Sequence, residues 1–444
     1  MKCTGNATIK TLLLAFVDGC GNIRIMKKIF ICLFFFLAIV TLGGCGGGGG
    51  ETATTTTTTV TTTSTAASTT TGTSTTTVAE TTTTTDTSTT TTITATTTTT
   101  STTIISFAIE TIDGQGFIAG SYCHIRVDNN NNPHISYYDS TNLRLRYANV
   151  ATSWKEVVYD VGLTSRNNLA IDSNNKIHLV CYDNNNTRLE YISGEAGFWH
   201  ESAVDASGWA SELTMSGIAV DQQNRPLISY YKTSANNPVV VANNASGSWT
   251  ADTVVEISQS SNNDTINAIA IDTNGKQHVL FVKNALHYAN NVSGAWQIQA
   301  TIESSDSGNF IAQNASFALG PDNVAHVCYM QNINPNYYFI YANNLTGSWV
   351  KETLFTSTET IGIYNSLAID ATGKVHISFT LGDNSRSLNY LTNINGPWHV
   401  TTVEALGVDQ YSWNSIDVDN YCRPHIAFYD EVNRDLKYAA PVAQ

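Results

Sequence analysis

An Asp followed six residues later by a His recurs at nearly even intervals from residue 128 onward in this 444-residue chain. Two further copies keep only one member of the pair, Asp221 before Leu227 and Gly320 before His326. The seven positions lie 44 to 51 residues apart, which is the period of four-stranded propeller blades. The five complete pairs are Asp128 and His134, Asp172 and His178, Asp272 and His278, Asp370 and His376, and Asp419 and His425.

Each repeat contains four short runs of β-branched and aromatic residues, separated by Asn, Gly and Ser. The second run begins at the His, as at 134–138, the third ends in Tyr-Ala, as at 147–148, and the fourth opens with Trp, as at Trp154. Such runs are typical of antiparallel hairpins, and none has the length or the period of a helix. The sequence therefore predicts an all-β fold in which each repeat forms one blade of four antiparallel strands.

The seventh repeat lacks the strand that opens with Trp, and a matching run stands alone before the first repeat. Within residues 106–113, the segment 107–112 aligns with 349–354 and has Phe in the Trp place. We expect 106–113 to pair with 433–440 as the outer strand of blade seven. This pairing predicts a closed seven-bladed β-propeller without large exposed sheet edges. The alternative, an open stack of small sheets, gives no reason for the lone strand.

Most repeats carry Ala two positions before the anchor, as expected for inner strands that crowd a central axis. The exceptions are Arg126 in the first repeat and Asp417 in the seventh. Because these two repeats are neighbours only in a closed ring, we expect Arg126 and Asp417 to meet as a buried, charge-assisted pair. The alternative is two unrelated exposed charges.

The region before the repeats contains a candidate export signal. Residues 26–45 begin with Met-Lys-Lys, continue with an apolar run and end in Leu-Gly-Gly-Cys, the pattern of a secretory signal. The ending resembles a bacterial lipobox, which implies that Cys45 is the lipidated first residue of the mature protein. The alternative is a membrane span, but the run is short for a hydrocarbon core of about 30 Å. Residues 1–25 are interpreted as a misassigned upstream start.

Residues 46–105 are rich in Gly and then in Thr, with almost no large apolar residues. Because such a composition cannot bury a core, we expect a disordered linker that holds the domain 106–440 away from a membrane. The alternative is a neutral repeat that expanded by replication slippage.

The formal net charge of −14 and the few, scattered basic residues argue against nucleic acid as a partner. Four cysteines fall within 106–440, and no spacing matches a zinc site. Cys181 and Cys328 are expected as small buried side chains. Export permits a disulfide between Cys123 and Cys422, although the two are expected at opposite ends of their strands, and this pairing stays open.

The repeated Asp and His have the chemistry of an acid–base couple or a metal site. A pair repeated around a ring is instead typical of a device that folds each blade. We expect each Asp to accept hydrogen bonds from turn amides, and each His to bond across the hairpin or to a neighbouring blade. Structural calcium in the Asp-rich turns is the alternative, although the turns lack the oxygen spacing of an EF-hand loop. No other cofactor is expected.

The positions where the repeats differ lie just before each inner strand, at the expected mouth of the central channel. They combine aromatic, amide and guanidinium groups, which suits a sugar because aromatic faces stack on C–H groups and amides bond to hydroxyls. The same mixture suits a protein partner, and ordinary loop residues that plug the channel are a third interpretation. The candidate ligand-binding residues are Tyr122, Arg166, Asn167, Asn267, Tyr364, Asn365, Trp413 and Asn414.

Signals of catalysis are weak. No Gly-x-Ser-x-Gly elbow, no phosphate-binding loop and none of the Asp boxes of sialidases occur. Asp139, Asp183 and Asp430 are expected in turns and form no recognisable pair of carboxylates. No catalytic residue is assigned, and we expect binding rather than catalysis.

The run 134–139, followed by 145–148 and Trp154, resembles repeats of bacterial secreted and lipid-anchored propeller proteins. It is more loosely similar to fucose-binding lectins and sialidase-like propellers. The resemblance implies a propeller over 106–440 and little about activity, because the matching residues are those that build blades.

Taken together, these features predict a lipoprotein of the bacterial cell envelope, at the outer membrane or the cell surface. We expect it to bind a glycan, or an envelope or extracellular protein, and to touch the membrane only through its lipid anchor. The alternatives are a hydrolase or lyase that acts on polysaccharide and a structural protein of the envelope.

Overall fold

The computed structural model describes the repeat region and four short strands before it. By its internal contacts the chain separates into a unit of residues 1–63 and 78–97 and a unit of residues 64–77 and 98–444, and each is described by itself. The described segments from residue 105 onward are 105–162, 166–205, 216–232, 238–256, 267–283, 285–304, 310–382, 386–407 and 412–442.

The four strands before residue 105 form two pairs. β1 (Ala15–Val17) pairs antiparallel with β2 (Ile23–Ile25), and β3 (Thr57–Ser64) pairs with β4 (Thr76–Thr83). The β3–β4 pair falls within the segment where the sequence predicts a linker. A two-stranded ribbon alone is marginally stable in water, so the division of this region into signal and linker stays a prediction.

The signal segment 26–45, with the candidate lipidation residue Cys45, lies outside the described residues. No described helix is long and apolar enough to cross a membrane.

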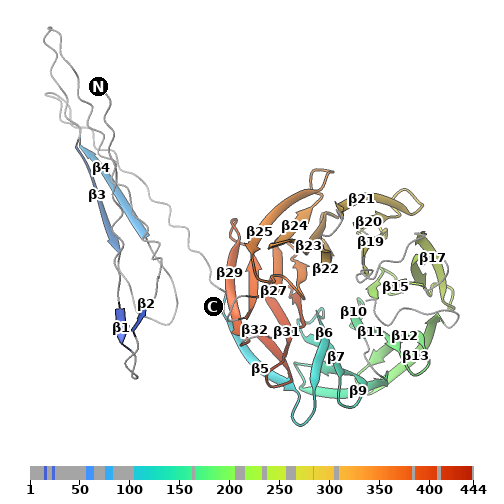
Figure 1. Ribbon diagram of the computed structural model, residues 1–444. Coiled ribbons are helices and arrows are strands. Elements are labelled where there is room, and N and C mark those ends of the chain that lie inside the picture. Colours follow the sequence, from blue (N-terminus) through green and yellow to red (C-terminus); the bar gives the residue numbers. More distant parts are fainter. Residues whose placement is uncertain are drawn as a thin grey trace, which may run out of the picture. The chain divides into compact units, whose positions relative to one another are not determined.

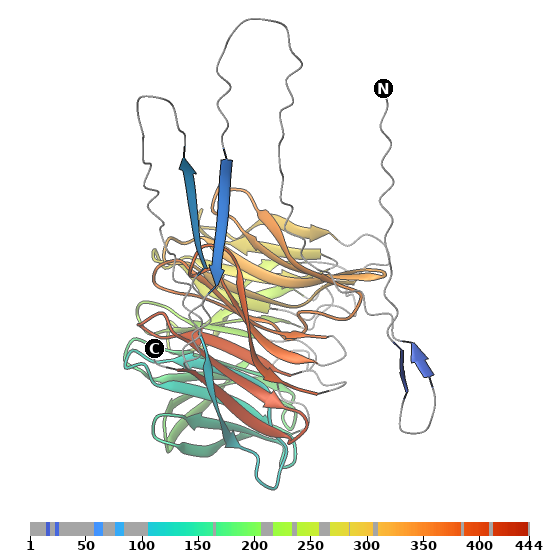
Figure 2. The same ribbon diagram turned by 90° about the vertical axis from the view of Figure 1, so that its left-hand side faces the viewer.

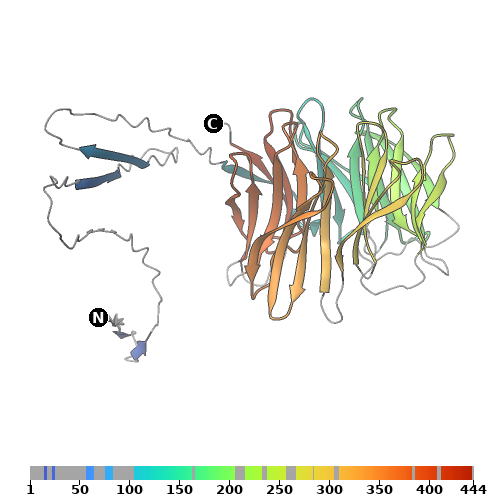
Figure 3. The same cartoon turned by 90° about the horizontal axis from the view of Figure 1, so that it is seen from above.

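Seven four-stranded antiparallel sheets stand around a central axis as blades (Figure 1). Six of them are meanders in chain order from the inner strand to the outer one, and the outer strand of the seventh comes from the start of the domain. Every described element is a strand. Figures 2 and 3 show the ring from its sides.

The first three blades have these strands: β6 (Ala119–Val127), β7 (Pro133–Asp139), β8 (Arg144–Asn149) and β9 (Trp154–Asp160); β10 (Asn167–Ile171), β11 (Ile177–Asp183), β12 (Arg188–Glu195) and β13 (Phe198–Asp205); β14 (Gly217–Val220), β15 (Pro226–Tyr231), β16 (Val239–Asn243) and β17 (Thr250–Val255). The next three have these: β18 (Asn267–Ile271), β19 (Gln277–Val282), β20 (Ala285–Asn290) and β21 (Gln297–Ser304); β22 (Phe310–Leu319), β23 (Ala325–Ile333), β24 (Asn336–Asn343) and β25 (Val350–Ser357); β26 (Ser366–Ile369), β27 (Val375–Leu381), β28 (Ser387–Thr392) and β29 (His399–Ala405).

Blade seven joins the two ends of the domain. Its strands are β30 (Asn414–Val418), β31 (Pro424–Asp430), β32 (Asp435–Pro441) and β5 (Phe107–Asp113). β5 pairs with β32 from Phe107 opposite Pro441 to Asp113 opposite Leu436. The predicted closed seven-bladed propeller, with an N-terminal outer strand, is confirmed.

The second strand of a blade is covered by neighbours on both faces, which explains its nearly continuous apolar sequence. Every residue of β7, β11 and β31 is buried. The hydrophobic clusters lie between adjacent blades, and one of them joins Ile125 and Tyr137 of blade one to Ala427 and Tyr438 of blade seven. The core is therefore a ring of interfaces between sheets, closed by the contact of the first blade with the last.

Each inner strand runs from the mouth face, where it begins, to the turn face, where the anchor position starts a tight turn. Three residues after each anchor the backbone has positive φ, for example +65° at Asn131. Asn and Gly tolerate this conformation. Blade seven has Cys422 there, with φ of +60°, and both Cys422 and Cys123 are free thiols. The disulfide that the sequence left open is not formed. The seven residues are Asn131, Asn175, Asn224, Gly275, Asn323, Gly373 and Cys422.

Candidate functional site

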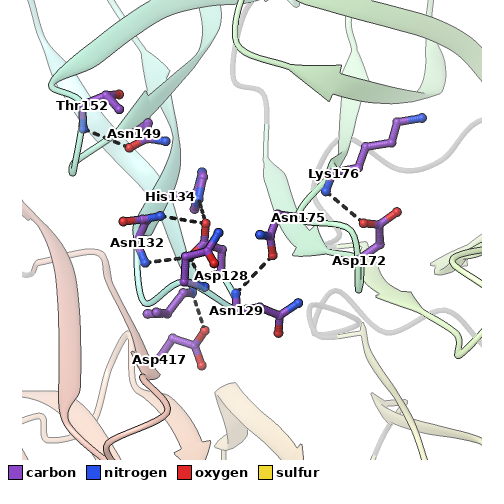
Figure 4. A network of polar contacts seen from close by, with 12 residues as sticks. Asp128, Asn129, Asn132, His134, Asn149, Thr152, Asp172, Asn175, Lys176 and Asp417 are labelled. Carbon is purple, nitrogen blue, oxygen red and sulfur yellow. Dashed lines mark hydrogen bonds and ion pairs between the residues drawn. The ribbon is translucent and has the colours of Figure 1, made fainter.

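The anchor Asp caps the tight turn that follows it. In blade one, Oδ1 of Asp128 accepts hydrogen bonds from the amides of Asn130 and Asn132, at 2.9 and 2.7 Å (Figure 4). The amides two and four positions after the anchor make the same bonds at Asp172, Asp221, Asp272, Asp370 and Asp419. One carboxylate oxygen thus satisfies turn amides that would otherwise be buried without partners.

The other carboxylate oxygen faces the His six positions after the anchor, and the His in turn contacts a Tyr of the third strand. In the five complete blades the distance from Nε2 to Oδ2 is 3.2 to 3.4 Å. Nδ1 lies 2.5 to 2.8 Å from the hydroxyl of Tyr147, Tyr191, Tyr288, Tyr390 or Tyr438. We call this arrangement the Asp–His–Tyr chain. Because a carboxylate only accepts, Nε2 carries the hydrogen and the Tyr hydroxyl donates to Nδ1.

The Tyr also connects its blade to the next one. Tyr147 meets the indole of Trp199 edge-on at 5.3 Å between ring centres, and the same contact recurs three more times. Phe107 makes it with Tyr390, so Phe fills the Trp place in blade seven. The sequence shows the Tyr-Ala signal but gives no hint that this Tyr is the partner of the His. These chains hold each hairpin and join neighbouring blades.

Two blades depart from the pattern. Blade three keeps Asp221 but has Leu227 for the His and Val241 where the other blades have the Tyr, so apolar side chains replace the His and the Tyr. Blade five keeps His326 and Tyr341, 2.6 Å apart, but has Gly320 in the anchor place. Only blade five therefore retains the His without its carboxylate.

The protein is expected to lose stability in two stages as the pH falls. Burial lowers the pKa of His134 below its ordinary 6.5, with Asp128 only partly offsetting this, and the same balance holds at His178, His278 and His425. A folded pKa below the unfolded one gives stability above about pH 6.5 that is lost as the pH falls.

The second stage comes from the anchor carboxylates. Burial alone would raise the pKa of Asp272, but hydrogen bonds from the turn and from His278 lower it below 3.8. Stability present above about pH 4 is therefore lost in stronger acid. Urea unfolding between about pH 8 and pH 3 measures both stages, and a midpoint that stays constant from pH 7 to pH 5 contradicts the first.

At the mouth face, four of the candidate residues come together from blades one, two, six and seven. Tyr364 stacks on Trp413 with ring centres 3.7 Å apart, and Trp413 contacts Tyr122 at 4.2 Å. The guanidinium of Arg166 lies over the ring of Tyr122, 5.6 Å from its centre. We call Tyr364, Trp413, Tyr122 and Arg166 the aromatic cluster. All four side chains are only partly buried.

Two members of the aromatic cluster have unusual backbones. Tyr122 has φ of +53° and Tyr364 has φ of +52°. For a bulky side chain such angles are uncommon and cost on the order of 1–3 kcal/mol. The cost is tolerated where the surrounding structure requires the conformation, and here it turns both carbonyls towards the following blade.

The three described Asn residues next to the aromatic cluster hold the blades together. Nδ2 of Asn167 donates to the carbonyl of Tyr122 at 3.0 Å, and Oδ1 of Asn167 accepts from Ser136 at 2.6 Å. Nδ2 of Asn414 donates in the same way to the carbonyl of Tyr364, and its Oδ1 accepts from Ser378. Both Asn side chains are buried and hydrogen-bonded between blades, and their expected role in contacting a ligand stays a prediction.

Asn365 is likewise buried, and its Oδ1 accepts from Ser316 at 2.8 Å and from the thiol of Cys328 at 2.9 Å. A signal for these contacts exists in the sequence. The next blade has Asn five residues before its anchor only where the preceding blade has Ser or Cys two residues after its His position. Elsewhere an apolar residue is followed by Ser, Ala or Cys. Asn267 fits this rule and begins β18, but its side chain lies outside the description.

Below the aromatic cluster lies a cavity of about 450 Å³, lined by inner strands of all seven blades. Tyr122, His124 and Arg126 of β6 are among the residues that line it. Burial, reinforced by the charge of Arg126, lowers the pKa of His124 to about 3. The sequence reasoning missed His124, which takes a place where other blades have Asn, Gly, Ala or Ser.

Arg126 and Asp417 also line this cavity, on adjacent inner strands. Oδ2 of Asp417 accepts from the amide of Val127 at 2.8 Å, and the guanidinium of Arg126 donates to the carbonyl of Ile125 at 2.7 Å. They act on each other at longer range: burial raises the pKa of Asp417, and Arg126 partly offsets this. Instead of the expected direct pair with Arg126, the carboxylate of Asp417 accepts a hydrogen bond from a backbone amide of the neighbouring strand.

Among the described residues, no group of His, Cys, Asp and Glu is arranged to hold a metal ion. Structural calcium was the alternative role for the anchor carboxylates. Their oxygens contact turn amides and His rings, as at Asp128.

No known protein family and no curated protein matches this chain. Among solved structures, an ulvan lyase from a new family of polysaccharide lyases, bound to GlcA(1-4)Rha3S, has a TM-score of 0.52 at 9% identity, over 75% of this chain and 98% of that one. A second structure of an ulvan lyase gives 0.51 at 9% identity, over 74% and 97%.

A lectin from Aleuria aurantia in complex with Fucα1-6GlcNAc has a TM-score of 0.44 at 14% identity, over 66% of this chain and 97% of that one. The likeness to the ulvan lyases shows a shared fold, because fold and function separate freely at such low identity.

Proposed function

We propose that this propeller binds a saccharide at the mouth of its channel and does not change it chemically. The observation that carries the proposal is the aromatic cluster, whose three rings all line the opening of the channel cavity. Aromatic rings held at a concave site are surfaces on which the C–H faces of a sugar ring stack, while polar groups around them fix its orientation.

The cluster also has the polar component that such a site needs. Arg166, whose guanidinium lies over the ring of Tyr122, is a donor that fits hydroxyl or carboxylate groups of a saccharide. We expect the rings of the aromatic cluster to supply the stacking surface and Arg166 to supply a donor at their side. The stacked rings are positioned by buried hydrogen bonds of their own backbones, so little freedom is lost on binding.

Catalysis is the second candidate, because β6 aligns a Tyr, a His and an Arg on the cavity wall. A lyase needs a base to remove a proton from the sugar. With a pKa of about 3, His124 is neutral near pH 7 but is a weak base. Burial raises the pKa of the Tyr137 phenol, which donates to Asp113 and does not line the cavity. Burial also raises the pKa of Asp417, whose carboxylate accepts a hydrogen bond from the amide of Val127. Binding is therefore the function that these groups support best.

Replacing Trp413 by Ala is expected to weaken saccharide binding by roughly 30-fold, about 2 kcal/mol, because Trp413 contacts both neighbouring rings. A glycan array followed by calorimetry on the full chain in mild detergent measures this. Phe198→Ala is the matched control, since Phe198 is 78% exposed on the outer strand β13 and lies away from the cavity.

Arg166→Ala leaves all three rings in place and is the second variant, in case Trp413→Ala does not fold. It is also expected to weaken saccharide binding. Equal binding by Trp413→Ala and the unaltered protein would refute the proposal. A glycan that returns shortened with an unsaturated end favours the lyase instead. Saturable capture of an envelope protein, with no glycan bound, favours a protein partner.

The expected setting is the outside of a bacterial cell, with the propeller anchored through lipidated Cys45. The motif at residues 26–45 supports this part of the proposal. The mass of the N-terminal peptide of the mature protein tests it, because a diacylglyceryl group on Cys45 adds a defined mass.

A further inference from the structure

Blade five carries a defect that the other blades do not share. Gly320 stands in the anchor place, and a Cβ at this position would lie 2.6 Å from Oδ1 of Asp322 and 3.2 Å from Nε2 of His326. Oδ1 of Asp322 instead accepts from the amide of Val324, at 3.2 Å. Asp322 therefore takes over one turn amide that an anchor Asp would hold, but it makes no contact within bonding distance of the imidazole.

His326 is consequently a buried ring with one nitrogen occupied. Its Nδ1 contacts the hydroxyl of Tyr341, while Nε2 has no hydrogen-bond partner among the described residues. The side chain is only 7% exposed. A ligand group that hydrogen-bonds to this nitrogen would take the position that the anchor carboxylate holds in the complete blades.

His326 lines a cavity of about 420 Å³ between blades five and six. The cavity lies on the turn face, opposite the aromatic cluster, because the third-to-fourth-strand turn of blade six forms one wall. Asp322 and Glu352 supply carboxylates, and Asn343 and Asn393 supply amides. Trp398 supplies an indole that Tyr341 holds edge-on at 5.2 Å.

We propose that this cavity is a second saccharide site, for one neutral pyranose ring, in which a sugar hydroxyl takes the place of the missing anchor carboxylate. The hydroxyl accepts the hydrogen of His326 Nε2 and donates to Asp322 or Glu352, and the ring face lies against Trp398. This site is independent of the channel mouth, so either can exist without the other. Together they would hold glycans on both faces of the ring.

The charges in the cavity decide among ligand classes. An anionic ligand would meet two carboxylates on a protein of net charge −14, which opposes it. Burial lowers the pKa of His326 to about 4, so the ring is neutral near pH 7 and offers no balancing cation. A metal ion lacks a site, because the described acidic and His side chains do not converge in a ligating group. A neutral polyol satisfies donors and acceptors together.

The test follows the imidazole of His326 by NMR, using the full chain labelled with ¹⁵N at histidine and carrying Trp413→Ala to remove the channel-mouth site. Methyl glycosides of glucose, mannose, galactose and fucose are titrated in turn. At least one is expected to shift the His326 Nε2 resonance and to leave His376, in its complete Asp–His–Tyr chain, unchanged.

Gly320→Asp restores the anchor carboxylate beside His326, provided that the exposed Asp322 side chain turns away. This variant is expected to melt at or above the temperature of its parent and to bind the sugar at least about tenfold more weakly. Glu352→Gln changes the cavity on an exposed strand and is expected to weaken binding without affecting folding.

Unchanged affinity in Gly320→Asp overturns the proposal, as does unchanged affinity in Glu352→Gln if the first variant fails to fold. A His326 resonance that no glycoside moves overturns the proposal as well. So does a resonance that moves only with a cationic ligand, either an amine such as ethanolamine or a divalent metal ion. Loss of binding in Gly320→Asp with retained binding at the channel mouth supports it.

Discussion

A chain that begins at residue 114 is expected to lose the cooperative unfolding transition of the propeller, whereas a chain that begins at residue 105 keeps it. The first truncation removes β5, so that β32 becomes the unpaired outer edge of blade seven. The lost ladder contributes about 1 kcal/mol for each backbone hydrogen bond. Summed over the strand, this is a large part of the stability of an ordinary domain, about 5–15 kcal/mol.

β5 also contributes side chains that the rest of the fold uses. Phe107 packs edge-on against Tyr390 of blade six. Asp113 accepts a hydrogen bond from Tyr137 and pairs with Arg146 of blade one, 3.2 Å from its Nε. Deleting the strand thus weakens three blades at once. Calorimetry and urea unfolding decide the matter, and a sharp transition at the same temperature in both truncations would show that the ring does not depend on this closure.

Asp370→Ala is expected to destabilise the protein by about 3 kcal/mol, far more than the same change at Asp221. Asp370 is 1% exposed and accepts from the amides of Thr372 and Lys374 at 2.8 and 2.9 Å. Its Oδ2 faces Nε2 of the fully buried His376 at 3.2 Å. Without the carboxylate, the imidazole and the turn amides are left buried and unpaired.

Asp221 is the matched control because blade three has Leu227 in the His place. Its carboxylate caps the same turn and otherwise meets the exposed Arg225, so Asp221→Ala is expected to cost about 1 kcal/mol. Adding His376→Leu to Asp370→Ala imitates blade three and is expected to recover part of the loss. Urea unfolding of the single and double variants measures the coupling. Equal losses in the free energy of unfolding at Asp370 and Asp221 would show that the Asp–His–Tyr chain does not contribute to stability.

The amino-acid sequence was sufficient to predict the blades, their number and the closing strand. These features depend on short runs of apolar residues, on turn residues within one hairpin and on a period that repeats seven times. The missing Trp strand of the seventh repeat and the lone segment 106–113 could be matched because they share this pattern. The turn role of the anchor Asp could also be expected, since it involves amides only two and four positions away.

The contacts between blades were decided by the tertiary structure. Asn167 and Asn414 were expected to contact a ligand, yet they join blades, and Asp417 bonds to a backbone amide instead of Arg126. These partners lie about 50 or nearly 300 residues apart in the chain, and the choice among them depends on side-chain direction and on competing donors nearby. Local pattern therefore determined each blade, because a hairpin is held by near neighbours. The channel mouth and the cavity beside His326 exist only once the ring brings distant strands together.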